Sequence, residues 1–225
     1  MDENTTADFN VLLLGASLTE GYTNNGTVMH PYEHEFVNTL SAHPPFLHRA
    51  VKTINAGVSG DHMTGTLMRP RLELHLAKAA AAGKPFDLVV IWGGANDVGW
   101  RVPVPEISAA IRGTHAAARA HGARVLALTI TEWDVELRDS RIAADIATLN
   151  AELRERMATN DDDGWALFDM RKAFPRPKIS ADNSMDDRDE LWCDGIHPSA
   201  RGYDSVGILI AHAVLSLFFC SEKIQ

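Results

Sequence analysis

Phe9-Asn10-Val11-Leu12-Leu13-Leu14-Gly15-Ala16-Ser17 passes from an apolar run directly into a glycine and a serine. A short, almost continuously apolar run that ends at a glycine is typical of a parallel strand covered on both faces. Leu88-Val89-Val90-Ile91, followed by Gly93-Gly94, repeats the pattern. We therefore predict buried parallel strands, each ending in a glycine-containing turn.

Similar apolar runs alternate with longer amphipathic runs along the whole chain. The strands are expected at Phe9–Leu14, Val51–Ile54, Asp87–Trp92, Arg124–Ile130 and Trp165–Asp169. The helices are expected at Tyr32–Leu40, Thr66–Ala82, Glu106–His121, Ser140–Thr159 and Ala200–Phe219. Five β–α repeats predict an α/β fold: a three-layer α/β/α sandwich around a five-stranded parallel sheet, in the flavodoxin-like order 2-1-3-4-5.

Length and composition indicate a single globular domain over residues 1–225. Hydrophobic residues make up 45% of the 225 and charged residues 23%, which is ordinary for a folded domain. The formal net charge of −9 argues against a nucleic-acid partner, because phosphate backbones are bound by basic surfaces. The oligomeric state is not readable from these features.

The chain start and its last apolar run bear on localisation. Residues 1–8 lack a basic and an apolar signal segment, so we expect a cytoplasmic protein. The run from Ile208 to Cys220 is shorter than the roughly 20 residues that span a bilayer, so we expect no stable membrane insertion. Cys193 and Cys220 are expected as free thiols, with Cys193 a small buried spacer.

Three glycine-containing turns follow the first three predicted strands, and each has more than one interpretation. Ser17 is a candidate nucleophile, although a phosphate-binding loop or a helix cap uses the same residues. Gly57 is a candidate backbone donor to an oxyanion or a simple turn glycine. Asn96 is a candidate side-chain donor to an oxyanion or a turn and capping residue.

A late motif supplies an acid and a base: Asp194-Gly195-Ile196-His197-Pro198. Asp194 and His197 are three residues apart, so one turn of chain can bring the Asp194 carboxylate to one ring nitrogen of His197. The other ring nitrogen is then left facing Ser17. The carboxyl ends of neighbouring parallel strands meet at one sheet edge, so Ser17, Gly57 and Asn96 should lie side by side. Together these residues predict an acyl-transfer site.

The four blocks resemble the SGNH hydrolases, also called the GDSL lipase/esterase family. They are Gly15-Ala16-Ser17-Leu18, Asn55-Ala56-Gly57, Gly94-Ala95-Asn96-Asp97 and the Asp194–Pro198 motif. The resemblance implies Ser17 as nucleophile, His197 as base and Asp194 as acid. It also implies an oxyanion hole made by the Ser17 and Gly57 N–H groups and the Asn96 side chain. Ala16 departs from the pattern, because the family has an aspartate there that supports the nucleophile turn.

The predicted activity is hydrolysis of small-molecule carboxylic esters, with short-chain acyl or acetyl esters as the default. No cofactor is expected, and no metal, although His30 and His34 are spaced as a metal pair. The acyl pocket should come from the loops Tyr22–Met29, Val98–Val104, Trp133–Leu137 and Arg171–Trp192. Trp100, Trp133 and Trp192 either line that pocket or pack beneath the loops.

Three alternatives stay open at this point. One is a thioesterase or an acyltransferase that uses the same site. A second is a non-catalytic module that binds a nucleotide with Gly15–Gly21 as a phosphate loop. The third is a scaffold that has lost its activity.

Overall fold

A five-stranded parallel sheet forms the centre of the computed structural model, which describes residues 7–159, 162–176 and 190–219. The strands are β1 (Phe9–Gly15), β4 (Val51–Gly57), β5 (Leu88–Trp92), β6 (Arg124–Leu128) and β7 (Trp165–Phe168). Their order is β4-β1-β5-β6-β7, and every neighbouring pair is parallel. The predicted fold class and strand order are therefore confirmed.

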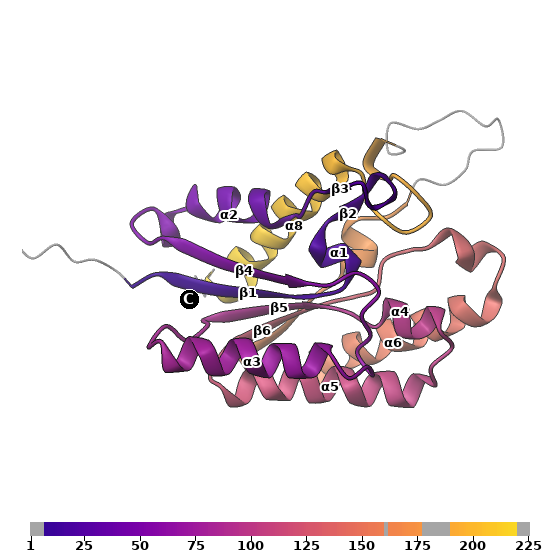
Figure 1. Cartoon of the computed structure of the whole chain (residues 1–225), viewed down its shortest axis with the longest axis horizontal. Helices are drawn as coiled ribbons and strands as arrows, with labels where there is room; N and C mark the ends of the chain where they lie inside the picture. The colour runs from indigo at the N-terminus through magenta and orange to yellow at the C-terminus, as the bar shows by residue number, and fades with distance from the viewer. Residues whose placement is uncertain (1–6, 160–161, 177–189, 220–225) are drawn as a thin grey trace, which may run out of the picture.

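Helices cover both faces of the sheet, as Figure 1 shows. On one face lie α2 (Glu33–Ser41) and α8 (Ala200–Phe218), which pack against each other. On the other face lie α3 (Met68–Ala81), α5 (Val104–Ala120) and α6 (Ser140–Thr159). The observed bounds of these five helices agree with the predicted runs to within two residues at each end.

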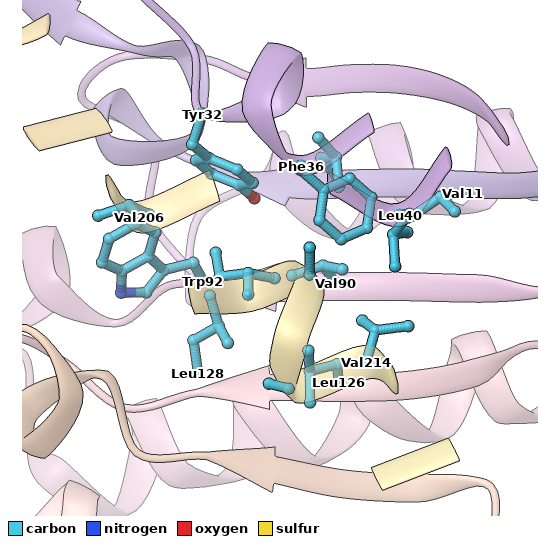
Figure 2. Close-up of a cluster of buried hydrophobic side chains, with 14 of the residues drawn as sticks. Val11, Tyr32, Phe36, Leu40, Val90, Trp92, Leu126, Leu128, Val206 and Val214 are labelled. Atoms are coloured by element: carbon cyan, nitrogen blue, oxygen red, sulfur yellow. The ribbon is translucent and has the colours of Figure 1, made fainter. Parts of the chain in front are cut away.

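Alternate residues of each strand enter two separate cores. Val11 and Leu13 of β1 join the cluster under α2 and α8, whereas Leu12 and Leu14 join the cluster under the other three helices. Figure 2 shows the first cluster, in which side chains of β1, β5 and β6 meet those of α2 and α8. Because both faces are buried, the strands contain apolar residues at consecutive positions.

The elements missing from the prediction are short and follow the strands. They include α1 (Ser17–Glu20), β2 (Tyr22–Thr23), β3 (Val28–Met29), α4 (Ala95–Gly99), the 3₁₀ helix η3 (Asp134–Leu137) and α7 (Met170–Ala173). Segments of two to five residues show no usable periodicity, so pattern reasoning does not find them. They build the loops at the carboxyl edge of the sheet, where open α/β sheets bind ligands.

Some predictions fall on residues that the structure does not describe. Residues 177–189 of the predicted pocket loop Arg171–Trp192 lie outside the described residues, and so does Cys220. Cys193 is described and is exposed, so its prediction as a buried spacer is wrong. No helix in the described ranges has the length and hydrophobicity needed to cross a bilayer.

Candidate active site

Ser17 lies at the sharp turn from β1 into α1, and its side chain is largely buried. The Ala16 carbonyl accepts hydrogen bonds from the Thr19 and Glu20 N–H groups at 3.0 and 2.9 Å. A Cβ at Gly15 would lie 2.2 Å from Thr19 Oγ1 and 2.5 Å from the Trp92 carbonyl oxygen, so only glycine fits at this position. The turn thus fixes the serine hydroxyl at the end of β1.

The imidazole of His197 lies between the Ser17 hydroxyl and the Asp194 carboxylate. The distance from Ser17 Oγ to His197 Nε2 is 3.0 Å, and that from His197 Nδ1 to Asp194 Oδ2 is 2.8 Å. With its proton on Nδ1, the ring donates to Asp194 and accepts from the Ser17 hydroxyl. The structure therefore brings together the three residues that the sequence singled out, in the order of a nucleophile, a base and an acid.

The second oxygen of Asp194 is also occupied. Its Oδ1 accepts hydrogen bonds from the Ile196 and His197 N–H groups at 2.8 and 2.6 Å. Burial raises the pKa of Asp194, but the hydrogen bonds from the backbone and ring of His197 and from Ile196 outweigh it and hold the pKa below its usual value. Asp194 is therefore a carboxylate at neutral pH.

The loop that carries Asp194 and His197 is held closed at its base. The Cys193 N–H donates to the His197 carbonyl at 3.0 Å, and the Ser199 N–H donates to the Leu191 carbonyl at 2.9 Å. The ring of Tyr22 packs against the His197 ring with centroids 4.5 Å apart. These contacts restrict the imidazole to the plane in which it reaches Ser17.

Arg176 fixes the same loop from outside. Its Nη1 donates to the Asp194 carbonyl at 3.0 Å, and its Nε lies 2.9 Å from Asp134 Oδ1. The Asp134 N–H in turn donates to the Gly195 carbonyl at 3.0 Å. No sequence pattern indicated this role for Arg176.

Asn96 and Asp97 connect α4 to the loop that follows β4. Asn96 Nδ2 donates to the Asp61 carbonyl at 2.8 Å. The fully buried Asp97 carboxylate accepts from the Met63 and Thr64 N–H groups, both at 2.9 Å. Asn96 thus lies at the predicted edge of the sheet, with its amide bonded to the loop that follows β4.

The structure does not support Gly57 as a backbone donor to an oxyanion. The Gly57 N–H donates to Asn55 Oδ1 at 2.9 Å, and a Cβ at Gly57 would lie 2.2 Å from the Glu20 nitrogen. Gly57 is therefore a glycine that permits close packing of β4 against α1.

Gly60, three residues further on, has open surroundings and an N–H without a described partner, unlike Gly57. It has φ of +80° in the turn in which the Asp61 N–H donates to the Val58 carbonyl, and no atom lies within 4 Å of the position of a Cβ. Among the described residues no group accepts a hydrogen bond from the Gly60 N–H. Its signal in the sequence is Ser59-Gly60, three residues beyond Gly57, which resembles an ordinary turn and so was not singled out.

Arg71 of α3 supports the nucleophile turn, in which Ala16 provides no carboxylate. Its guanidinium donates to the Gly15 carbonyl at 3.1 Å, to the Ala56 carbonyl at 3.0 Å and to Asp61 Oδ2 at 2.6 Å. One side chain thus links the ends of β1 and β4 to the loop that contains Gly60.

A cavity of about 400 Å³ adjoins the loop of His197. Trp133, Val135 and Ile196 give it an apolar lining, and Asp134, Arg138 and Gly195 complete the wall. The predicted pocket loop Trp133–Leu137 therefore does line a cavity. Trp133 and Trp192 are buried, whereas Trp100 is 76% exposed.

The last candidates from the sequence are His30 and His34, which are spaced as a metal pair. His30 Nε2 lies 2.7 Å from Asp204 Oδ1. Within the described ranges no group of three or more His, Cys, Asp and Glu side chains is arranged to hold a metal ion. The absence of a metal or cofactor requirement stays a prediction.

Comparison with protein-family models matches residues 13–204 to the GDSL-like lipase/acylhydrolase family. The matched range contains Ser17, Asn96, Asp194 and His197. A search of curated protein sequences finds no match.

Solved structures with the same fold include three esterases or lipases. A lipase/acylhydrolase from Enterococcus faecalis is 24% identical, with a TM-score of 0.64 over 92% of this chain and 96% of that one. A carbohydrate acetylesterase from Sinorhizobium meliloti is 18% identical, with a TM-score of 0.64 over 94% and 100%. An aryl esterase from M. smegmatis is 18% identical, with a TM-score of 0.61 over 93% and 99%. At these identities the likeness concerns the fold.

Proposed function

This chain belongs to the GDSL-like lipase/acylhydrolase family and is a carboxylic ester hydrolase, and we propose that it cleaves short-chain acyl or acetyl esters with Ser17, His197 and Asp194. The observation that carries the proposal is the continuous hydrogen-bonded chain from Ser17 Oγ through the His197 ring to Asp194. A serine hydroxyl is a weak nucleophile until an adjacent base removes its proton. The 3.0 Å contact with Nε2 is within the range that such a base requires.

In the first half of the reaction, Ser17 Oγ attacks the ester carbonyl while His197 Nε2 takes the hydroxyl proton. The imidazolium is stabilised by Asp194, which is held as a carboxylate by its hydrogen bonds. Collapse of the tetrahedral intermediate breaks the bond to the alcohol, which leaves with the proton from His197. Water then attacks the acyl-enzyme by the same route, and the carboxylic acid and free Ser17 are regenerated.

The negative charge that develops on the carbonyl oxygen needs donors fixed in advance. The Ser17 N–H and the Asn96 amide are two proposed donors. We assign the third to the Gly60 N–H, because no described group accepts a hydrogen bond from it, whereas the Gly57 N–H is bonded to Asn55. Donors that need no rearrangement lower the barrier more than mobile donors do.

The apolar cavity beside Ile196 is the proposed site of the acyl group. It shares Gly195 and Ile196 with the loop that carries the base, and its lining is mostly apolar, which is the reason for assigning the acyl group to it. An acetyl group leaves most of the 400 Å³ unfilled, and a somewhat longer chain would use it. Acetyl esters are also the substrates implied by the name of the similar S. meliloti enzyme.

The first test is intact-mass analysis after treatment with a fluorophosphonate, which reacts with an activated serine whatever the natural substrate is. We expect one adduct on the wild type, none on Ser17→Ala, and an unchanged adduct on Ser216→Ala, which removes an exposed serine of α8. Ser17→Ala and His197→Ala should also lose on the order of 10³-fold or more in kcat for ester hydrolysis. Labelling of Ser17→Ala, or a folded wild type without an adduct, would overturn the assignment.

A panel of esters then defines the substrate. Acetyl, butyryl and octanoyl esters of one alcohol compare acyl lengths, and a thioester of the preferred acyl group tests thioesterase activity. Addition of a second alcohol tests acyl transfer, because a transferase yields a new ester in proportion to that alcohol. A preference for octanoyl over acetyl and butyryl esters would contradict the short-chain part of the proposal.

A further inference from the structure

Trp100 presents its indole to solvent at the end of α4, one helical turn beyond Asn96. Its side chain is 76% exposed, although tryptophan is usually among the most buried residues of a protein. The Trp100 N–H donates to the Asn96 carbonyl at 2.9 Å, so the indole and the proposed oxyanion donor belong to one short, continuous element. Figure 1 shows α4 close to the ends of the central strands.

The backbone around Trp100 is fixed on both sides. The Arg101 and Val102 N–H groups donate to the Val98 and Asp97 carbonyls, both at 3.0 Å. Arg101 has φ of +63°, a conformation that non-glycine residues adopt rarely. Arg101 Nη1 also donates to Asp139 Oδ1 at 3.2 Å, which ties it to the start of α6. A strained residue held by its surroundings is a feature that concentrates at functional sites.

A second ring faces Trp100 from the loop after β4. The His62 and Trp100 ring centroids are 5.8 Å apart, and the rings are tilted by 58°. The His62 N–H donates to Asp61 Oδ1 at 2.8 Å, and the next two N–H groups are bound by the buried Asp97. Because Asn96 and Asp97 of α4 hold both sides of this loop, the two rings keep a fixed relative position without packing into the core.

We propose that Trp100 and His62 form a subsite that stacks on the apolar face of a six-membered ring in the ester substrate, either an aromatic ring or a sugar. Rigid, exposed aromatic rings bind such faces at little cost in conformational entropy. Because Trp100 lies one helical turn from the proposed oxyanion donor Asn96, we assign the stacked ring to the ester that Ser17 attacks. The inference rests on the proposed function, because it assigns a substrate class to the Ser17 site.

The experiment compares esters that differ in the ring but have similar leaving groups. Benzyl acetate carries an aromatic ring on the alcohol, ethyl phenylacetate carries it on the acyl group, and a monoacetylated methyl glucoside carries a sugar. n-Butyl acetate carries no ring. We measure kcat/KM for each on the wild type, Trp100→Ala and Trp100→Phe, and on Leu74→Ala, which removes an exposed apolar side chain from α3.

We expect Trp100→Ala to lower kcat/KM about 3- to 10-fold for at least one ring ester, and to leave n-butyl acetate unchanged within about twofold. Trp100→Phe should retain most of the preference, and Leu74→Ala should change neither class. A selective loss for benzyl acetate or ethyl phenylacetate assigns an aromatic ring, and one for the acetylated glucoside assigns a sugar. An equal change for ring and alkyl esters would overturn the subsite.

Labelling of Ser17 by a small alkyl fluorophosphonate separates this inference from the proposed function. If the wild type is not labelled and hydrolyses no ester, the proposed function fails. If labelling of Trp100→Ala equals that of the wild type while no ring ester is selectively affected, only the subsite fails.

Discussion

Among single residues, Asn96 links the proposed oxyanion site to the loop after β4, because its amide holds the Asp61 carbonyl at 2.8 Å beside the turn of Gly60. A neutral amide provides an N–H donor at the edge of the sheet without adding a charge near His197. The sequence indicated this residue through its place after a buried strand. Its partner on the loop after β4 was not indicated.

Replacement of Asn96 tests the oxyanion site. We expect Asn96→Ala to lower kcat about 10²- to 10³-fold, with a much smaller change in KM, because the lost donor acts mainly on the transition state. Asn96→Asp keeps the shape but removes the donor, so its loss in kcat should be at least as large. Steady-state kinetics on an acetyl ester measures both parameters.

Asn38→Ala is the matched control, because Asn38 is an exposed residue of α2. Its kinetics should equal those of the wild type. An Asn96→Ala enzyme with near-wild-type kcat would remove Asn96 from the proposed oxyanion site.

At the scale of elements, α3 contributes to the site although it provides none of the reacting groups. Arg71 extends from α3 to two strand ends and forms an ion pair with Asp61 in which both side chains are largely buried. Three directional hydrogen bonds from one guanidinium suit arginine and not lysine. The helix therefore sets the distance between the turn of Ser17 and the turn of Gly60.

Removal of Arg71 should weaken both the fold and the site. We expect Arg71→Ala to lower the free energy of unfolding by about 3 kcal/mol, because it leaves the buried Asp61 carboxylate without its partner. We expect Arg71→Lys to remain folded but to label more slowly at Ser17, because the ammonium cannot reach all three acceptors. Urea denaturation and fluorophosphonate labelling rates measure the two effects.

Arg69 provides the comparison on the same helix. It pairs with Glu73 on the exposed face, where such pairs contribute roughly 0.3 to 0.5 kcal/mol. Equal destabilisation by Arg69→Ala and Arg71→Ala would show that Arg71 has no special role in joining the strands.

For the molecule as a whole, a buried histidine that is not part of the candidate site makes stability depend on pH. His115 of α5 is buried, and its Nδ1 accepts a hydrogen bond from Trp165 Nε1 at 3.1 Å. Burial, together with the nearby charge of Arg156, lowers the pKa of His115 to about 3. The folded protein therefore holds this ring neutral, whereas an unfolded chain protonates it near pH 6.5.

The sign of the effect follows from proton linkage. Below about pH 6.5 the unfolded state takes up a proton that the folded state does not, so the free energy of unfolding falls as pH falls toward 3. The contribution reaches about 1.4 kcal/mol per pH unit. Urea denaturation between pH 7.5 and 4, as a rough working range, should show a shallower decline for His115→Gln than for the wild type. Parallel curves would contradict this account, because the other titrating groups are common to both proteins.

Sequence patterns alone were enough to predict the sheet order, the two layers of long helices and the candidate residues Ser17, Asn96, Asp194 and His197. Periodicity and apolar runs are local properties of the chain, and the rules that join β–α units leave few arrangements for five of them. The four residues were recognisable because each lies in a short motif at a strand end or in a late loop.

Contacts between segments that are distant in the chain could not be predicted and are seen in the folded molecule. It places Ser17 and His197 3.0 Å apart although 180 positions separate them, and it brings Arg71 to the ends of two strands. It also leaves Cys193 exposed and distinguishes Gly60 from Gly57. Sequence patterns do not reveal such contacts, because a free N–H, a close backbone approach or an exposed ring depends on the residues that pack beside it. Those neighbouring residues come from elsewhere in the chain.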